Sequence, residues 1–298
     1  MDVNSGYSLS NAVKFIGFVC KYIPRGKGVV ARLFGRVFSP WLKNKYVITR
    51  YGAKLVIDAH NIDFYATMYR WNNSWEHWVF DTAYWLMPQN GVFYDIGGNV
   101  GYMTIEMLQR KPNIQAVCFE PIPNLAATII QSLALNGFSN RASVYKYGLS
   151  DRHDAIGTLS VPAHQIHASL EKNDNVSNAP VIEIDLVSLD QLCEDKNLAL
   201  PDLIKIDIEG HEYKALLGAN RVLKESKPHV LFEVSNQNEF KDVVSVLSGL
   251  SEYRYFHAIG SYRPMQEIQI NEIISNKIDV IAVNLKRPDL PADLISQL

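Results

Sequence analysis

An acidic residue followed by a loop of very small side chains is the part of this sequence best suited to chemistry. The apolar run 92–94 leads into Asp95, and the loop after it reads D-x-G-x-N-x-G, with Gly97, Asn99 and Gly101. Glycine allows a turn with positive φ and lets a ligand lie against the main chain. A carboxylate here repels a pyrophosphate and suits a ligand that carries ammonium and sulfonium groups. The loop therefore predicts a site for S-adenosylmethionine, since a dinucleotide site would read G-x-G-x-x-G.

Two further carboxylates stand where predicted strands end. The apolar run 114–119 stops at Glu120, 25 positions after Asp95. A carboxylate at that place can accept hydrogen bonds from both hydroxyls of a ribose. The strand predicted at 203–206 ends at Asp207. Because parallel α/β sheets bind ligands beyond the carboxyl ends of their strands, we expect the three acids to face one crevice.

Five segments occur in an order typical of one enzyme family: DIGGNVGYMTI (95–105), FEPIPNLAATIIQSLALNG (119–137), GLSD (148–151), LIKIDIEGHEYKALLGA (203–219) and VLFEV (230–234). Together they resemble the FkbM family of S-adenosylmethionine-dependent methyltransferases, over roughly residues 45–285. The resemblance implies cofactor contacts at Asp95, Gly97, Asn99, Gly101, Glu120, Pro121, Ser150, Asp151 and Asp207. It also implies O-methylation of a hydroxyl on a sugar, a glycan or a related metabolite. The acceptor itself is not identified.

Two residues just beyond Asp207 are candidates for the general base, namely His211 and Glu209. Methyl transfer to a hydroxyl needs an aligned donor and acceptor and a group that takes the proton. The usual histidine pKa of about 6.5 suits this role. Each residue also has a purely structural interpretation, His211 in the first turn of a helix and Glu209 as a carboxylate at a helix N-terminus. With Asp207 and Glu212 they resemble a set of metal ligands, but alternate residues on an extended segment cannot all converge, so we expect no metal.

The alternation of strand and helix patterns after residue 91 predicts an α/β fold of the Rossmann-like class I methyltransferase type. We expect a mostly parallel twisted sheet with helices on both faces and an antiparallel last strand. Strand-like runs at 155–161 and 181–187, separated by a polar stretch at 171–178, predict a hairpin insertion after strand three, where acceptor specificity would be built. We divide the chain into a basic helical and hairpin accessory region, 1–90, and a methyltransferase domain, 91–298.

Composition favours a globular enzyme of the cytoplasm. The chain has 298 residues and is 47% hydrophobic, enough for one sizeable core and a smaller accessory layer. Its three cysteines have no metal-like spacing, which argues against a disulfide framework and a cysteine zinc site. No apolar run approaches the ~20 residues of a membrane span, and the first residues lack the basic start of a signal peptide.

The N-terminal arm has a lopsided charge. Between Val3 and Ile57 the chain carries ten basic residues and no acidic one. Mixed with apolar residues, these cations suit peripheral contact with an anionic membrane surface or a lipid-linked substrate. The alternative is a helical cap that buries its apolar residues on the domain and leaves Lys and Arg in water. The sequence leaves both interpretations open.

Four of the five tryptophans cluster before the first parallel strand. Trp71, Trp75, Trp78 and Trp85 have spacings of four, three and seven, which place them on one face of a predicted helix. A stripe at helical period is more often core than a platform for a sugar ring, so we expect core, with a residue at the rim still able to stack on a sugar. Glu76 in the same segment could reach the amino group of the cofactor.

Three other functions compete with this interpretation. A nucleic-acid methyltransferase, for example one acting on RNA ribose, would fit the basic arm. Base methylation, however, typically goes with an Asn/Asp-Pro-Pro-aromatic run where this chain reads D-I-E-G at 207–210, and no nucleic-acid partner is favoured. A scaffold that binds the cofactor without turnover is disfavoured by the intact Asp95, Glu120 and Asp207. An NAD-dependent oxidoreductase is disfavoured by Asp95 beside the loop.

Overall fold

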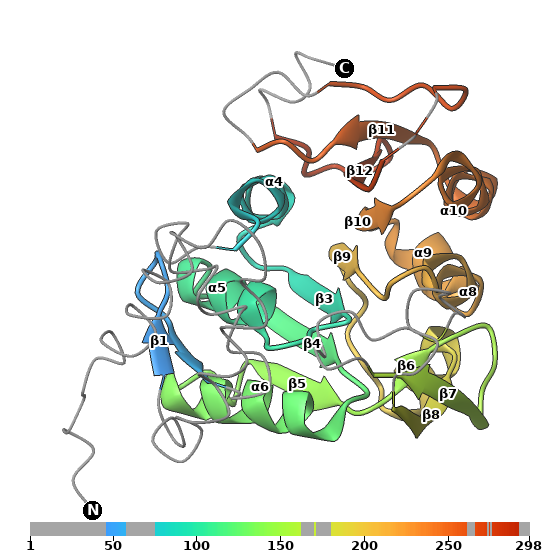
Figure 1. The fold of residues 1–298 in the computed structure, drawn as a ribbon. Coiled ribbons are helices and arrows are strands. Elements are labelled where there is room, and N and C mark those ends of the chain that lie inside the picture. Colours follow the sequence, from blue (N-terminus) through green and yellow to red (C-terminus); the bar gives the residue numbers. More distant parts are fainter. Residues whose placement is uncertain are drawn as a thin grey trace, which may run out of the picture.

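A seven-stranded sheet with the order β11-β12-β10-β9-β3-β4-β5 runs through the molecule (Figure 1). The computed structural model describes residues 46–57, 75–161, 170, 180–260, 266–272, 274 and 276–291. The strands are β3 (Val92–Ile96), β4 (Gln115–Phe119), β5 (Ala142–Tyr145), β9 (Leu203–Ile206), β10 (His229–Val234), β11 (Tyr253–His257) and β12 (Ile278–Asn284). Strand β12 pairs antiparallel with both β10 and β11, and the other neighbours are parallel. The predicted Rossmann-like sheet and its antiparallel last strand are confirmed.

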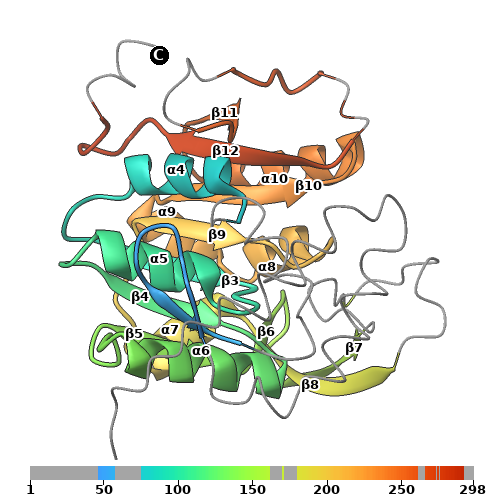
Figure 2. The same cartoon turned by 60° about the vertical axis from the view of Figure 1, so that its left-hand side comes forward.

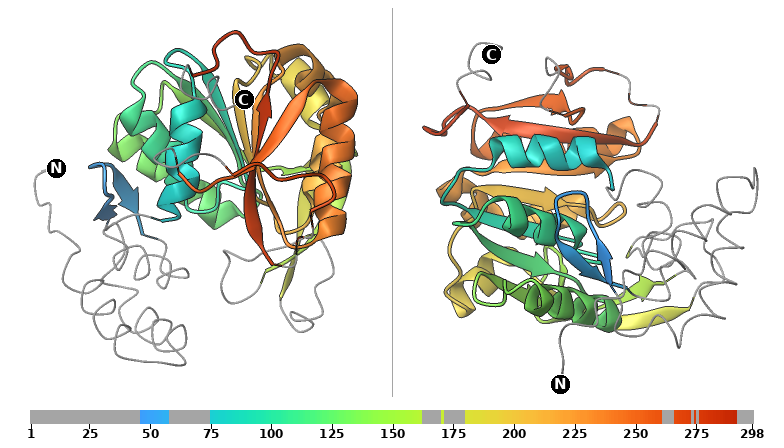
Figure 3. Two further views of the ribbon diagram at one scale, coloured as in Figure 1. Left: turned by 90° about the horizontal axis from the view of Figure 1, so that it is seen from above. Right: turned by 90° about the vertical axis from the view of Figure 1, so that its left-hand side faces the viewer.

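Helices cover both faces of the sheet, as predicted. On one face lie α4 (His77–Leu86), α5 (Tyr102–Arg110) and α6 (Pro123–Leu135). On the other lie α7 (Leu189–Asp195), α8 (Glu212–Leu217), α9 (Asn220–Ser226) and α10 (Gln237–Leu250). Figure 3 shows the sheet edge-on between these layers. The central strands are mostly apolar, and their apolar residues on both faces enter one of the two buried clusters, with a charged residue in each of β3, β9 and β10.

The hairpin predicted within the accessory region is present and packs on the main domain. Strands β1 (Tyr46–Ile48) and β2 (Lys54–Val56) pair antiparallel. The main-chain N–H of Lys54 donates to Asn136 Oδ1 at 2.8 Å, and that of Val56 donates to Ser132 Oγ at 2.9 Å, which ties the hairpin to α6 (Figure 2). The division of the chain at residue 90 stays a prediction. The expectations for the arm before residue 46 lie outside the described residues.

The tryptophan segment differs from its prediction in extent. Helix α4 begins at His77, so Trp75 precedes it, and Trp71 lies outside the described residues. The helix starts there because Glu76 adopts a left-handed conformation with φ of 38°, which interrupts helical periodicity. Trp75, Trp78 and Trp85 are partly buried against the core, as expected.

The predicted hairpin insertion forms a small sheet of its own. Strands β7 (Ala155–Ser160) and β8 (Val181–Val187) pair antiparallel, and β8 also pairs with β6 (Gly148–Leu149). This sheet lies beside the carboxyl ends of the main strands (Figure 2). The polar stretch 171–178 lies outside the described residues. None of the described helices is both long enough and apolar enough to span a bilayer.

Candidate active site

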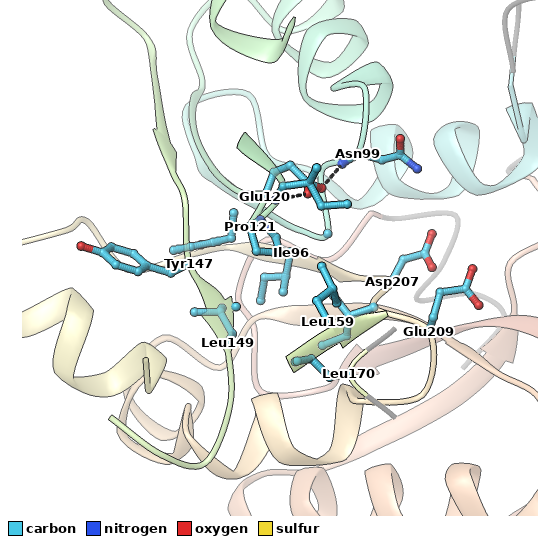
Figure 4. A pocket seen from close by; sticks show the side chains of 15 residues that line it. Ile96, Asn99, Glu120, Pro121, Tyr147, Leu149, Leu159, Leu170, Asp207 and Glu209 are labelled. Atoms are coloured by element: carbon cyan, nitrogen blue, oxygen red, sulfur yellow. Dashed lines mark hydrogen bonds between the residues drawn. The ribbon is translucent and has the colours of Figure 1, made fainter. Parts of the chain in front are cut away.

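Many of the site residues predicted from the sequence lie together where β3, β4 and β9 end. Strand β3 lies between the other two, so that Asp95 pairs with Cys118 on one side and Lys205 on the other. A cavity of about 70 Å³ opens at this edge (Figure 4). Its lining includes six of the predicted residues: Gly97, Asn99, Glu120, Pro121, Asp207 and Glu209. Leu159 and Leu170 add an apolar surface to the lining.

The glycine loop is held against both neighbouring strands. The N–H groups of Gly97 and Gly98 both donate to the carbonyl of Phe119 at 3.0 Å. Gly97 has φ of 81°, and a Cβ there would lie 2.0 Å from the carbonyl oxygen of Asp207. Any side chain at Gly97 would therefore displace the loop. This main chain forms a close-fitting cradle for a ligand.

Glu120 binds the same loop through its carboxylate. Its Oε2 accepts from the N–H of Asn99 at 2.7 Å and its Oε1 from the N–H of Ile122 at 2.9 Å (Figure 4). Burial raises the pKa of Glu120 to about 7, although these two N–H groups lower it. Each carboxylate oxygen has a second lone pair, so Glu120 can still accept from a pair of ribose hydroxyls.

Asp95 lies beneath the cavity and outside its lining. Its Oδ2 accepts from the N–H of Thr104 at 3.1 Å and from Thr104 Oγ1 at 2.6 Å, which fixes the first turn of α5. Burial raises the pKa of Asp95, and nearby Lys205 lowers it. Asp95 Oδ1 and Asn99 Oδ1 are buried and have no hydrogen-bond partner among the described residues. Such orphaned oxygens are rare in proteins, and with the glycine cradle and Glu120 they fit a cofactor that carries a ribose and cationic groups.

Lys205 supplies a positive charge inside this acidic edge. The side chain is buried, and its Nζ lies 3.1 Å from Asp207 Oδ2. Burial lowers the pKa of Lys205, but the carboxylates of Asp207, Asp95 and Glu76 outweigh this effect and keep the pKa above its usual value. Lys205 therefore stays charged and offsets part of the acid charge.

Three carboxylates converge next to the cavity. Oxygens of Asp207, Glu209 and Glu233 lie within 4.8 Å of one another, an arrangement able to hold a divalent cation. The ammonium of Lys277 lies among them, 3.1 Å from Glu209 Oε2 and 2.5 Å from Glu233 Oε2. A lysine charge thus stands beside the acids that a metal would use.

The sequence grouped a different set of acids at this point. Glu212 lies in the first turn of α8 and accepts from the N–H groups of Ile208 and Gly210 at 3.0 and 3.3 Å. It therefore takes the position at the helix N-terminus that the sequence considered for Glu209. Glu209 itself lies before the helix, with φ of 54°.

His211, Ser150 and Asp151 form a hydrogen-bonded group away from the cavity lining. His211 is 5% exposed, and its Nε2 lies 3.1 Å from Ser150 Oγ. Ser150 Oγ donates to Asp151 Oδ1 at 3.0 Å. Tyr147, Gly148 and Leu149 form the cavity wall here instead (Figure 4). Of the two base candidates, Glu209 faces the cavity and His211 does not, and the catalytic role of each stays a prediction.

Sequence reasoning missed several charged residues of this edge. Glu233 closes an apolar strand much as Asp95 closes the first one, and that shared signal could have found it. Lys205 interrupts a buried strand, and a lysine in such a place must be paired. Asp279 and Lys277 carry no comparable local signal.

Glu76, which the sequence did name, lies near the same acids. Burial, followed by the charges of Asp207 and Asp279, raises the pKa of Glu76 to about 8.

Comparison with known proteins points to one family. A family model described as "Methyltransferase FkbM domain" matches residues 95–281. Hexuronic acid methyltransferase AglP from Haloferax volcanii is 29% identical over 164 residues, which cover 54% of this chain and 62% of that protein. The 2-O-methyltransferase NoeI from Sinorhizobium fredii is 26% identical over 163 residues, which cover 50% of this chain and 65% of that protein. The chain thus spans less than two thirds of the length of these relatives.

A solved structure has a similar chain path. The crystal structure of methyltransferase FkbM from Methylobacillus flagellatus KT superposes with a TM-score of 0.45 at 15% sequence identity. The superposition covers 87% of this chain and 60% of that chain.

Proposed function

As a member of the FkbM methyltransferase family, this chain is a methyltransferase, and we propose that it transfers the methyl group of S-adenosylmethionine to a hydroxyl oxygen of a sugar or glycan. One observation carries the proposal. The cavity at the ends of β3, β4 and β9 combines a glycine cradle, the buried carboxylate of Glu120 and the half-buried carboxylates of Asp207 and Glu209. This donor set suits a ribose and cationic groups.

Each part of the cavity has a task in holding the cofactor. Glu120 would accept hydrogen bonds from the ribose hydroxyls. The main chain at Gly97 and the wall formed by Tyr147 and Leu149 would enclose the adenosine. Asp207 would attract the ammonium group, because its carboxylate lines the cavity and Lys205 offsets only part of the acid charge there.

The protein has two tasks in the reaction, alignment and proton removal. When bound, the cofactor supplies an electrophilic methyl group. The acceptor hydroxyl oxygen would take the methyl group, the electron pair of the C–S bond would stay on sulfur, and a carboxylate of this chain would take the hydroxyl proton. Glu209 is the proposed proton acceptor, since it faces the cavity and Lys277 orients it at 3.1 Å. Alignment of this kind supplies much of the rate enhancement in bimolecular reactions.

We propose sugar hydroxyls as acceptors because two relatives are named for such activity, one a hexuronic acid methyltransferase and the other a 2-O-methyltransferase. The test is to follow formation of S-adenosylhomocysteine over a panel of sugars, nucleotide sugars, lipid-linked glycans and RNA. Turnover on a sugar-containing acceptor supports the proposal. Turnover on RNA alone contradicts it.

Binding of S-adenosylhomocysteine tests the cofactor part separately. Calorimetry should show that Glu120→Ala weakens binding sharply. Glu183→Ala is the matched control, because Glu183 is an exposed glutamate on β8 outside the cavity lining. Equal affinity in the Glu120 variant and the wild type would refute the cofactor assignment.

A further inference from the structure

A second and larger cavity of about 560 Å³ lies at the far end of the same sheet edge. The first turn of α4 supplies His77, Trp78 and Asp81 to its wall. The end of β11 supplies His257 and the residues after it, and the start of β12 supplies Asp279. None of the functional residues predicted from the sequence, Trp78 aside, belongs to this lining.

The strand register places this cavity next to the reaction edge. Asp279 pairs with Glu233 across β12 and β10, and Glu233 belongs to the three converging carboxylates. His257 pairs with Val280 on the next strand pair. The cavity therefore begins one strand beyond the carboxylates that border the cofactor cavity. A molecule bound in it would extend toward Asp207 and Glu209.

The lining offers an aromatic surface together with hydrogen-bonding groups. Trp78 Nε1 donates to Asp279 Oδ2 at 3.3 Å, which fixes the plane of the indole. The His77 ring meets that indole edge-on, with centroids 5.0 Å apart. Ile259 adds an apolar surface that is 38% exposed. The Trp78 indole beside imidazole and carboxylate groups suits a ring-shaped ligand with several hydroxyls around its edge, because hydroxyls both donate and accept hydrogen bonds.

The charges on this side of the edge select against an anionic ligand. No lysine or arginine belongs to the described lining of the second cavity. Lys205 and Lys277, between the two cavities, are already paired with Asp207, Glu209 and Glu233. Burial, followed by Asp207, raises the pKa of Asp279, so further negative charge is unfavourable at this place. A carboxylate on the ligand would add one more like charge to a partly desolvated acidic site.

We propose that the second cavity binds the acceptor as an uncharged sugar unit that lies against Trp78, and that it discriminates against the corresponding uronic acid. This inference rests on the proposed function and deepens it, because it assigns the acceptor to named residues. It also separates this chain from its relative named for hexuronic acid, in the class of sugar that it methylates.

The test uses the full chain and matched pairs of ligands. Methyl hexopyranosides and the corresponding methyl hexopyranosiduronates serve as probes, with binding measured by saturation-transfer NMR in the presence of S-adenosylhomocysteine. We expect the wild type to bind at least one uncharged hexoside at least tenfold more tightly than its uronate. Trp78→Ala should weaken that binding at least tenfold and leave the affinity for S-adenosylhomocysteine within twofold.

Two further variants keep the test decisive. Trp85→Ala is the matched control, since Trp85 lies two turns along the same helix, is also partly buried, and is outside the cavity lining. His77→Ala repeats the test at an exposed position should Trp78→Ala unfold. Asp279→Asn should raise the relative affinity for the uronate several-fold, because it removes one like charge and keeps an acceptor for Trp78.

The failure of this inference differs from a failure of the proposed function. Three results would overturn the acceptor site alone, provided that S-adenosylhomocysteine binding is intact. The wild type could bind no hexoside, it could prefer the uronate, or its hexoside affinity could be unchanged in both Trp78→Ala and His77→Ala. Lack of S-adenosylhomocysteine binding by the wild type would overturn the proposed function instead.

Discussion

Replacing Glu120 by glutamine should change both the strength and the pH dependence of cofactor binding. Burial raises the pKa of Glu120 to about 7, so its ionised fraction grows from about 9% at pH 6 to about 91% at pH 8. The ionised carboxylate is the better acceptor for ribose hydroxyls, because hydrogen bonds to charged groups contribute about 1.5–3 kcal/mol against about 1 kcal/mol for neutral ones. If only that form binds, the affinity of the wild type for S-adenosylhomocysteine rises about tenfold over this range, or about 1.4 kcal/mol.

Glutamine cannot ionise, so the variant should lack this part of the pH dependence. Its amide also turns an N–H group toward one of the two main-chain donors, so we expect about 10- to 100-fold weaker binding at pH 8. Calorimetry at pH 6, 7 and 8 on both proteins measures the two effects, with Glu183→Gln as control. Other titrating groups such as Glu76 act in both proteins, so the difference between their slopes isolates Glu120. The same slope in the wild type and Glu120→Gln would refute the reasoning.

Three other substitutions follow from the structure. Gly137→Ala should lower the free energy of unfolding by roughly 1–2 kcal/mol in urea denaturation, because Gly137 has positive φ. Gly97→Ala should lower it several times more, because Gly97 also has positive φ and its added Cβ would lie 2.0 Å from a carbonyl oxygen. Similar losses in the two variants would contradict this. Burial raises the pKa of Glu106 to about 7, above its usual 4.5, so its contribution to stability is complete below about pH 4.5 and is lost as the pH rises through about 7. Glu106→Gln should therefore flatten the pH dependence of unfolding and recover up to about 3 kcal/mol at pH 8; an unchanged pH profile would count against it. Lys277→Met removes the ammonium shared by Glu209 and Glu233, so calorimetry should show tighter Mn²⁺ binding than in the wild type; equal or weaker binding would show that the lysine does not compete with a cation.

The sequence predicted those parts of the fold whose signals are local. The helix that the sequence places at His211 is α8 (Glu212–Leu217), which Gly218 ends. The parallel strands were readable from buried runs that stop at a carboxylate. The helix predicted from the tryptophan spacing is longer than α4, since periodicity does not reveal that Glu76 takes a left-handed conformation.

The site residues also divide into those with a local sequence signal and those without one. Asp95, Gly97 and Asn99 come from a single turn, and Glu120 from the next strand, so sequence spacing alone could indicate them. Glu233 and Asp279 are 46 positions apart and meet only through the antiparallel register of β10 and β12. No short pattern encodes a register that depends on how two distant strands pair.

The two cavities share one set of charged residues, which would act on both the methyl donor and the acceptor. Carboxylates outnumber lysines at the ends of β9, β10 and β12, and the lysines there are held in ion pairs. In the proposed reaction that excess would attract the cationic donor, and the same acids would hold the neutral thioether product less strongly than the sulfonium donor. An anionic acceptor would weaken this difference by bringing its own negative charge to the edge. An uncharged acceptor would let the donor alone respond to the acids, so the proposed donor charge and the proposed acceptor class depend on each other.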